Sequence, residues 1–500
     1  MARLVLPAWR MRLGLPLALT VLASAPALAQ PANQPAPPAA PPAPARPTPP
    51  ATPPATQPAA PAQPEADALS SFEKELDALF VQGGLTADQA ASRAPAASPE
   101  VRRSAAEIDV AVAQAEAAEL IRVPRVGATA TYTRLSSIDS LMLGPAMIDF
   151  PTNSYGAQAQ VSVALSDYLL RYPKVIDGAK LGLEAARVSK RADELGAGQD
   201  ARLAYYEWVR SRLQVLIATR QLTQVRATLG QVRALAEAQR LSNADRMRVE
   251  SQEAQAEQAL DQLRFLSELR EEQLRLFIGA APGEQLAIGE DIRVELAAPG
   301  GQALDQALAE ATRQRLEFRA LELGISAKEK QRESEQANQL PKLSAFATID
   351  YAKPNQRVFL EPDKFNLTWA AGLQLSWTLN DALLARATER RIDAETRELR
   401  ADRENLERGT RLAVLSAQQA VALAQRAFAT SQKGLAAAEE SYRVRQALLA
   451  AQRATAVELV DAETELTRSR ITALNARVDL RIAIAQLAHA LGADAKASTK

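Results

Sequence analysis

Part of this 500-residue chain repeats once, at an offset of about 215 residues. Each short match is weak alone, but four recur in the same order, which indicates a duplicated unit. The matching segments are Glu100–Arg102 with Glu317–Arg319, Pro124–Val126 with Pro341–Leu343, Leu165–Asp167 with Leu379–Asp381, and Ala238–Arg240 with Ala451–Arg453. We therefore expect two copies of one structural unit, over residues 97–280 and 304–492, joined by residues 281–303.

Each repeat contains two segments in which apolar and polar residues alternate, a pattern that predicts β-strands. We place the strands at about 126–135 and 155–167, and at about 343–352 and 367–379, with Phe346 on the otherwise polar face. These lengths match the roughly 9 to 11 residues that a tilted strand needs to cross a bilayer. Alternation also fits a pair of soluble hairpins with one buried face, and that alternative stays open.

Aromatic residues are concentrated around these strands. Half of the chain's Trp, Tyr and Phe residues lie within 126–172 and 343–381. Such enrichment is typical of the aromatic girdles of outer-membrane barrels. The girdle candidates are Tyr132, Tyr155, Tyr351, Trp369 and Trp377. Because the smallest bacterial barrels have eight strands, four strands predict a barrel shared by several chains.

Two proline-free stretches predict unusually long helices. No proline occurs between Lys174 and Ala281, or after Pro362. A helix from about Tyr168 to Gln239 would be on the order of 105 Å long. Helices over 98–122 and 243–280 could stack end to end beside it. Heptad spacing in the long helices also fits a coiled-coil rod, which is the alternative.

The first 64 residues lie outside the repeats. Arginines before residue 13, an apolar stretch over 13–23, and alanines at 27 and 29 predict a signal peptide over 1–29. The cleavage site disfavours a retained anchor helix. Residues 31–64 hold 15 of the 29 prolines, so 30–64 is predicted to be a Pro/Ala-rich linker. No segment approaches 18 continuous apolar residues, so membrane insertion would require strands.

Composition excludes several classes of function. A net charge of +0 gives no surplus of basic residues for nucleic-acid binding. The chain has no Cys and only one His, His489, which we interpret as a packing or capping residue. We find no phosphate-binding loop, metal-spaced His pair or nucleophile with a base. The sequence therefore predicts no enzyme, no catalytic residue, no metal site and no cofactor.

Several motifs together resemble the TolC-type outer-membrane efflux proteins (outer membrane factors). The first helix opens with Ser98–Arg102, the first strand is entered through Val123–Val126, and the second helix turn is followed by Ala456–Glu463. The second repeat ends with Leu480–Gly492, whose last three residues are Ala-Leu-Gly, and this ending is also typical of the family. The resemblance covers about residues 97–492, and the motifs are specific to the family but not to a subfamily.

The resemblance implies a mainly α fold with membrane β-strands. Four strands per chain would form a 12-stranded barrel in a homotrimer, above a tube of long coiled-coil helices. Residues 65–96 and 281–303 would be equatorial segments, and 493–500 a short tail.

The same resemblance implies a passive exit duct in the cell outer membrane that extends into the periplasm. It would serve a tripartite efflux or type I secretion system, opened by a periplasmic adaptor (membrane fusion protein) and an inner-membrane RND, ABC or MFS pump. The competing hypothesis is a periplasmic coiled-coil scaffold whose hairpins pack on protein instead of outer-membrane lipid.

The two helix turns are the candidate functional region. By the resemblance, Glu458 and Asp461 form an acidic ring at the pore entrance, and their spacing of three places both on one helical face. The resemblance assigns tip closure and adaptor docking to Gln239, Arg240, Asp245, Gln452 and Arg453.

Two positions in the turns depart from the family pattern. Ala454 stands where the family has an Arg that can link to the acidic position of Asp245, so this closing link is in doubt. Gln239 and Gln452 replace the family's turn Gly, the usual residue for a left-handed helix end. Either another residue, such as Asn243, takes that conformation, or the helices end differently.

Overall fold

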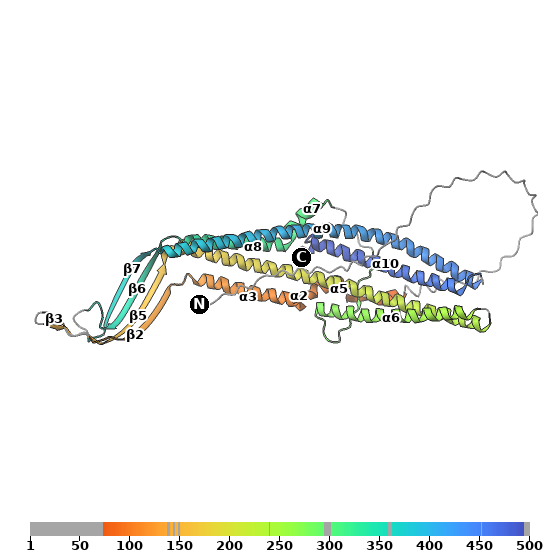
Figure 1. Ribbon diagram of the computed structural model, residues 1–500, viewed down its shortest axis with the longest axis horizontal. Helices are drawn as coiled ribbons and strands as arrows, with labels where there is room; N and C mark the ends of the chain where they lie inside the picture. Colours follow the sequence, from red (N-terminus) through yellow and green to blue (C-terminus); the bar gives the residue numbers. More distant parts are fainter. Residues whose placement is uncertain are drawn as a thin grey trace, which may run out of the picture. The chain divides into compact units, whose positions relative to one another are not determined.

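The computed structural model describes residues 74–137, 141–143, 146–148, 151–239, 241–294, 302–358, 363–451 and 453–494. The predicted signal peptide and linker, together with Arg240 and Gln452, lie outside the described residues. The described chain is mostly helical with a few strands, which confirms the predicted mainly α class (Figure 1).

The duplicated unit is visible as one order of elements that occurs twice: a helix, two long strands, a very long helix and a shorter helix. In the first copy these are α3 (Pro99–Leu120), β2 (Arg125–Arg134), β5 (Asn153–Ala164), α5 (Tyr172–Glu237) and α6 (Asn243–Ile278). In the second they are α8 (Leu316–Ala337), β6 (Lys342–Lys353), β7 (Asn366–Ser376), α9 (Leu379–Ala450) and α10 (Ala456–Ala490).

Shorter elements surround these units. They are β1 (Phe80–Leu85), α2 (Ala87–Ala97), the hairpin of β3 (Leu141–Leu143) and β4 (Ala146–Ile148), α4 (Leu165–Leu170) and α7 (Leu304–Gln314). Two predicted strand ends were wrong. Residues 165–167 are helical because α4 begins directly after β5. Strand β7 ends at Ser376, and Trp377 and Thr378 connect it to α9.

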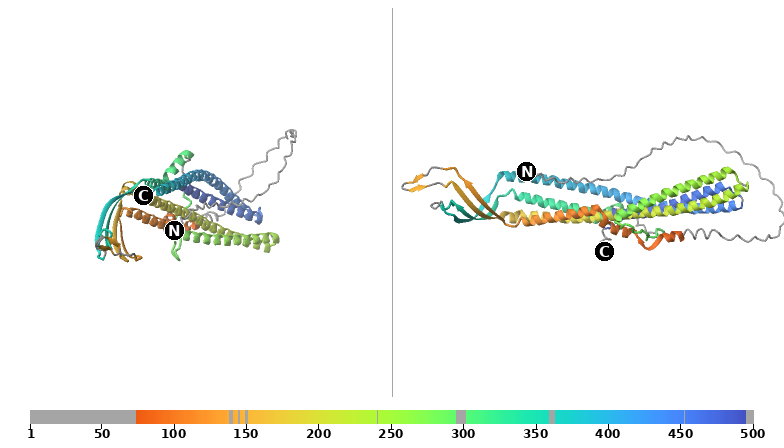
Figure 2. Two further views of the ribbon diagram at one scale, coloured as in Figure 1. Left: turned by 60° about the vertical axis from the view of Figure 1, so that its left-hand side comes forward. Right: turned by 90° about the horizontal axis from the view of Figure 1, so that it is seen from below.

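The long helices form without interruption because their interiors lack proline. Helix α5 has 66 residues and α9 has 72, or about 100 and 110 Å at 1.5 Å per residue. Helices α3 and α6 both pack along α5, while α8 and α10 pack along α9 (Figures 1 and 2). None of the described helices is apolar enough over a sufficient length to cross a membrane.

The four long strands form one antiparallel sheet in the order β2-β5-β6-β7 (Figure 1). Its register sets apolar residues opposite apolar residues across every pair, for example Val126 with Val161, and Ile349 with both Ala159 and Trp369. One face of the sheet is therefore apolar across all four strands. It is also exposed, with Trp369 at 73%. Among the described residues, β2 and β7 each pair along one side only.

Phe346, which broke the predicted alternation, lies on the polar face opposite Gly372. A Cβ at residue 372 would come within 3.2 Å of the Phe346 ring. The ring therefore covers the backbone of a residue that has no side chain, an arrangement that stabilises glycine in strands.

The main apolar core lies around the middle of α5. Trp208, Tyr205 and Val209 are fully buried there, and they pack with α2, α6, α10 and the segment around Ile288. That segment runs beside β1, where Gly289 and Gly84 approach so closely that a Cβ on Gly289 would lie 2.1 Å from the Gly84 oxygen. Strand β1, which precedes the first repeat, and the segment around Ile288, which follows it, thus pack directly against one another.

Candidate functional site

The turn between α5 and α6 uses Gln239 itself as the left-handed residue. Its φ is 58°, the only positive φ at a non-glycine residue in the described chain. Asn243 is the first residue of α6 instead, with Ser242 as its N-cap. The prediction that another residue, such as Asn243, takes the left-handed conformation was therefore wrong, because Gln239 takes it itself. A non-glycine residue in this region costs roughly 1–2 kcal/mol, which the surrounding helix packing must offset.

In both turns, the helix that follows the turn begins with a side-chain cap. The Ser242 hydroxyl accepts from the Asp245 backbone N–H at 3.1 Å and donates to the Asp245 carboxylate at 2.7 Å. In the second turn, the Thr455 hydroxyl accepts from the Glu458 N–H at 3.3 Å. Asp245 therefore serves the N-terminus of its own helix, where a carboxylate is favourable.

The two carboxylates predicted as an acidic ring are each paired with an arginine. Glu458 lies 2.9 Å from Arg445 of α9, and Asp461 lies 3.3 Å from Arg248 of α6. The Arg248–Asp461 pair joins the first helical hairpin to the second. The sequence analysis identified neither arginine. Arg248 and Asp461 are 213 residues apart in the chain, and such a separation gives no indication of contact. Exposed pairs of this kind contribute about 0–1 kcal/mol each.

The two helix turns form the tip of the helical part. Next to them lies a small apolar cluster, and one buried carboxylic acid lies beyond this cluster. Leu229, Val232, Val249 and Val460 form the cluster. On α10, Glu463 is 3% exposed, and its Oε1 accepts from the Thr228 hydroxyl of α5 at 2.9 Å. Burial raises the pKa of Glu463 to about 7, although the Thr228 hydrogen bond lowers it. The sequence places Glu463 in a family motif but gives no sign that it is buried.

The predicted girdle residues lie at both ends of the apolar face of the sheet and between these ends. Tyr132, Tyr155 and Tyr351 gather with Phe365 at the end of the sheet distant from the helices, with ring centroids 5.1–6.2 Å apart. Trp377 lies beyond β7, beside the helices, where its indole N–H donates to the Gln339 carbonyl at 3.2 Å. Trp369 lies between the two levels on the exposed apolar face.

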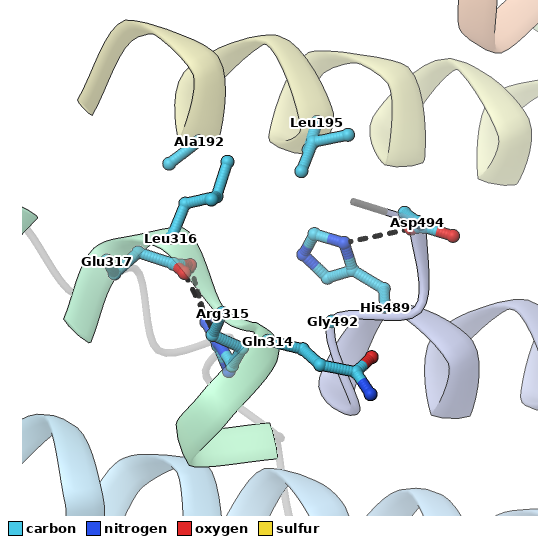
Figure 3. A pocket seen from close by; sticks show the side chains of 9 residues that line it. All are labelled: Ala192, Leu195, Gln314, Arg315, Leu316, Glu317, His489, Gly492 and Asp494. Atoms are coloured by element: carbon cyan, nitrogen blue, oxygen red, sulfur yellow. Dashed lines mark hydrogen bonds and ion pairs between the residues drawn. The ribbon is translucent and has the colours of Figure 1, made fainter. Parts of the chain in front are cut away.

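The single histidine lines a pocket between α5, the α7–α8 junction and the end of α10 (Figure 3). His489 Nδ1 lies 3.3 Å from an Asp494 oxygen, and Arg315 pairs with Glu317 at 2.7 Å. Burial raises the pKa of Glu317, but the Arg315 hydrogen bond and charge outweigh it, so the pKa lies below its ordinary value. No group of described residues here or elsewhere has three or more potential metal ligands.

A buried arginine attaches the inter-repeat segment to α10. Arg481 is 4% exposed and pairs with Glu290. It also donates to the carbonyls of Asp291 at 3.2 Å and Val294 at 2.7 Å. The Tyr206 hydroxyl donates to Glu290 from α5 at 3.3 Å. The sequence did not indicate this contact between segments that lie far apart in the chain.

The fold is shared with several solved outer-membrane channels. The structure resembles that of CusC (16% identity, TM-score 0.68, covering 83% of this chain and 93% of that one). It also resembles VceC from Vibrio cholerae (17%, 0.66, 86% and 99%) and the open MtrE channel of Neisseria gonorrhoeae (17%, 0.67, 81% and 88%). No curated protein matches the sequence.

A protein-family match covers the second repeat. Residues 307–493 match the outer membrane efflux protein family. The match confirms the resemblance drawn from the sequence motifs. It locates the protein in the outer membrane, from which it extends into the periplasm.

Proposed function

We propose that this protein is the outer-membrane exit duct of a tripartite efflux or type I secretion system and that three copies form one passive channel. One observation carries the proposal: the four-stranded sheet has an exposed apolar face, and within the described part of the chain its two outer strands, β2 and β7, each have a neighbouring strand on one side only. Lipid accounts for the exposed face, and neighbouring copies account for the two edges.

The dimensions of the sheet support insertion into a bilayer. Strand β6 has 12 residues, and a tilted strand needs roughly 9 to 11 to cross a bilayer. Its alternate residues from Leu343 to Tyr351 form an apolar band on one face. Aromatic side chains flank this band on both sides.

The family resemblance gives three as the number of copies, and the space needed for passage favours three over two. Two copies would give eight strands, and barrels of that size are filled by their own side chains. Three copies give twelve strands and a wider interior. The trimer therefore fits a duct better than a dimer does.

The proposal is tested by the extraction and mass of the mature protein. Membranes are washed with carbonate and then extracted with detergent, and the protein mass is determined by light scattering. A particle of three chains that requires detergent is expected. Release by carbonate as a monomer or dimer would replace the duct with the alternative, a periplasmic scaffold whose strands pack on protein.

We also propose that Glu458 and Asp461 form the acidic ring at the entrance, with six carboxylates contributed by three copies. Replacing both residues with Ala should weaken block of the channel by multivalent cations by about tenfold, because charge at a narrow mouth attracts cations. Assembly should persist, since exposed ion pairs contribute little to stability. Planar-bilayer conductance measures the block, and Glu465→Ala, an exposed change on the same helix, is the control. Unchanged block would refute the ring.

The two turns are the proposed docking site for the adaptor, which in turn connects to the inner-membrane pump. The family resemblance assigns this role to five residues: Gln239, Arg240, Asp245, Gln452 and Arg453. Asp245 also caps α6, so Arg453 and Gln239 are better positions for a photo-crosslinker. If neither position captures an adaptor in cells, the docking assignment fails.

A further inference from the structure

Glu463 is a carboxylic acid enclosed between two helices with one hydrogen bond. Only 3% of the residue is exposed, and Thr228, its partner on α5, is buried as well. Oε1 accepts from the Thr228 hydroxyl, but Oε2 is buried and has no hydrogen-bond partner in the described structure. An ionised carboxylate in this position would leave one oxygen without the donors that water provides, so burial penalises the ionised form.

The arginines described next, on α10 and the neighbouring helices, interact with acidic residues other than Glu463. On α5 and α6, Arg226 pairs with Glu253 and Glu257, and Arg248 pairs with Asp461. On α9, Arg445 pairs with Glu458. Two turns along α10 from Glu463, Arg470 interacts with Glu439 of α9. Burial and Thr228 alone shift the titration of Glu463, so no described cation stabilises its ionised form.

We infer that Glu463 is a proton-binding gate residue: its neutral form holds α10 against α5 beneath the tip, and its ionisation separates the two helices and favours the open entrance. The inference rests on the proposed function, because separation of these helices opens a channel only if the chain forms one. It concerns a residue outside the acidic ring, and it acts through packing and not through contact with the cargo.

The direction of the effect follows from proton linkage. The pKa of Glu463 is about 7 in the packed state and would return to its ordinary value of 4.5 in water. The packed state therefore binds a proton that the open state releases. Packing is strongest below pH 4.5 and weakens as the pH rises through 7. Between pH 5 and pH 8, the ratio of open to packed molecules should increase on the order of 70-fold.

The test measures helix separation in the detergent-solubilised full chain, without a bilayer. Because the chain has no cysteine, spin labels can be attached specifically at Ala227→Cys of α5 and Arg468→Cys of α10, both exposed positions. Their separation is followed from pH 5 to pH 8, and infrared difference spectra follow protonation of the carboxyl group. We expect a longer distance at high pH, with the same midpoint as loss of the protonated carboxyl signal.

Two variants separate this mechanism from a general effect of pH. Glu463→Gln keeps the shape and the Thr228 partner but cannot ionise, so its distance should stay short throughout. Thr228→Val removes the hydrogen bond that lowers the pKa, so the midpoint should move to higher pH. Glu465→Gln, on the exposed face of α10, should behave as the unchanged chain does.

Each outcome decides one claim. A distance that does not respond to pH, or a response that persists in Glu463→Gln, would overturn the gate assignment. If the distances respond as expected but the protein forms no channel in planar bilayers, the duct proposal fails while the proton-binding role of Glu463 stands.

Discussion

Replacing Leu373 with arginine should abolish stable insertion of the protein into the outer membrane. Leu373 lies in β7 on the apolar face and is 68% exposed. Arginine on the lipid face of a barrel costs about 2–4 kcal/mol at the bilayer midplane, and each trimer would carry three such residues. We expect Leu373→Arg to be nearly absent from the detergent-extracted trimer fraction, as measured by fractionation and light scattering.

The adjacent residue provides a matched control. Gln374 points to the opposite, polar face of the same strand, so Gln374→Arg introduces the same charge toward the interior of the proposed barrel. This variant should insert and assemble normally. If both variants insert equally well, the exposed apolar face does not contact lipid, and the soluble-hairpin alternative regains support.

Replacing Arg481 with methionine should destabilise the attachment of the inter-repeat segment by about 3–5 kcal/mol, because removal of one partner leaves a buried charge uncompensated. Glu290 would lose its cation, and the carbonyls of Asp291 and Val294 would lose their donor. Limited proteolysis should cut near residues 281–302 much faster, and the thermal unfolding midpoint of the detergent-solubilised protein should fall.

Arg400 supplies the control for that change. It pairs with Glu329 at 3.1 Å, but more than half of its side chain is exposed. Arg400→Met should therefore cost no more than about 1 kcal/mol and should leave the proteolysis pattern unchanged. Equal sensitivity of the two variants would show that burial of Arg481 does not set its contribution.

The sequence predicted periodic features well, because periodicity reports which residues share one face of an element. The alternation around Ile349 and Trp369 located strands that the structure pairs in one sheet. The absence of proline predicted the bounds of α5 to within a few residues, and it predicted a second long helix, which the structure contains as α9. Strand ends were less accurate, because apolar residues such as Leu165 continue the alternation into a helix.

Contacts between distant segments could not be predicted from one sequence. Arg248 and Asp461, or Arg481 and Glu290, are ordinary charged residues on helices until the fold brings them together. Burial of Glu463 likewise depends on how α10 is rotated against α5. The left-handed conformation of Gln239 could not be predicted either, because glutamine has no intrinsic preference for it.

The central pairing of the sheet has a consequence for biogenesis. Strand β5 pairs with β6, yet nearly 180 residues, including α5 and α6, lie between them in the chain. During export, the first hairpin enters the periplasm long before its partner, with one edge of β5 still unpaired. Such long-range pairing slows folding and exposes strands to aggregation. The nascent chain must therefore be kept from associating with other copies until its second half has emerged.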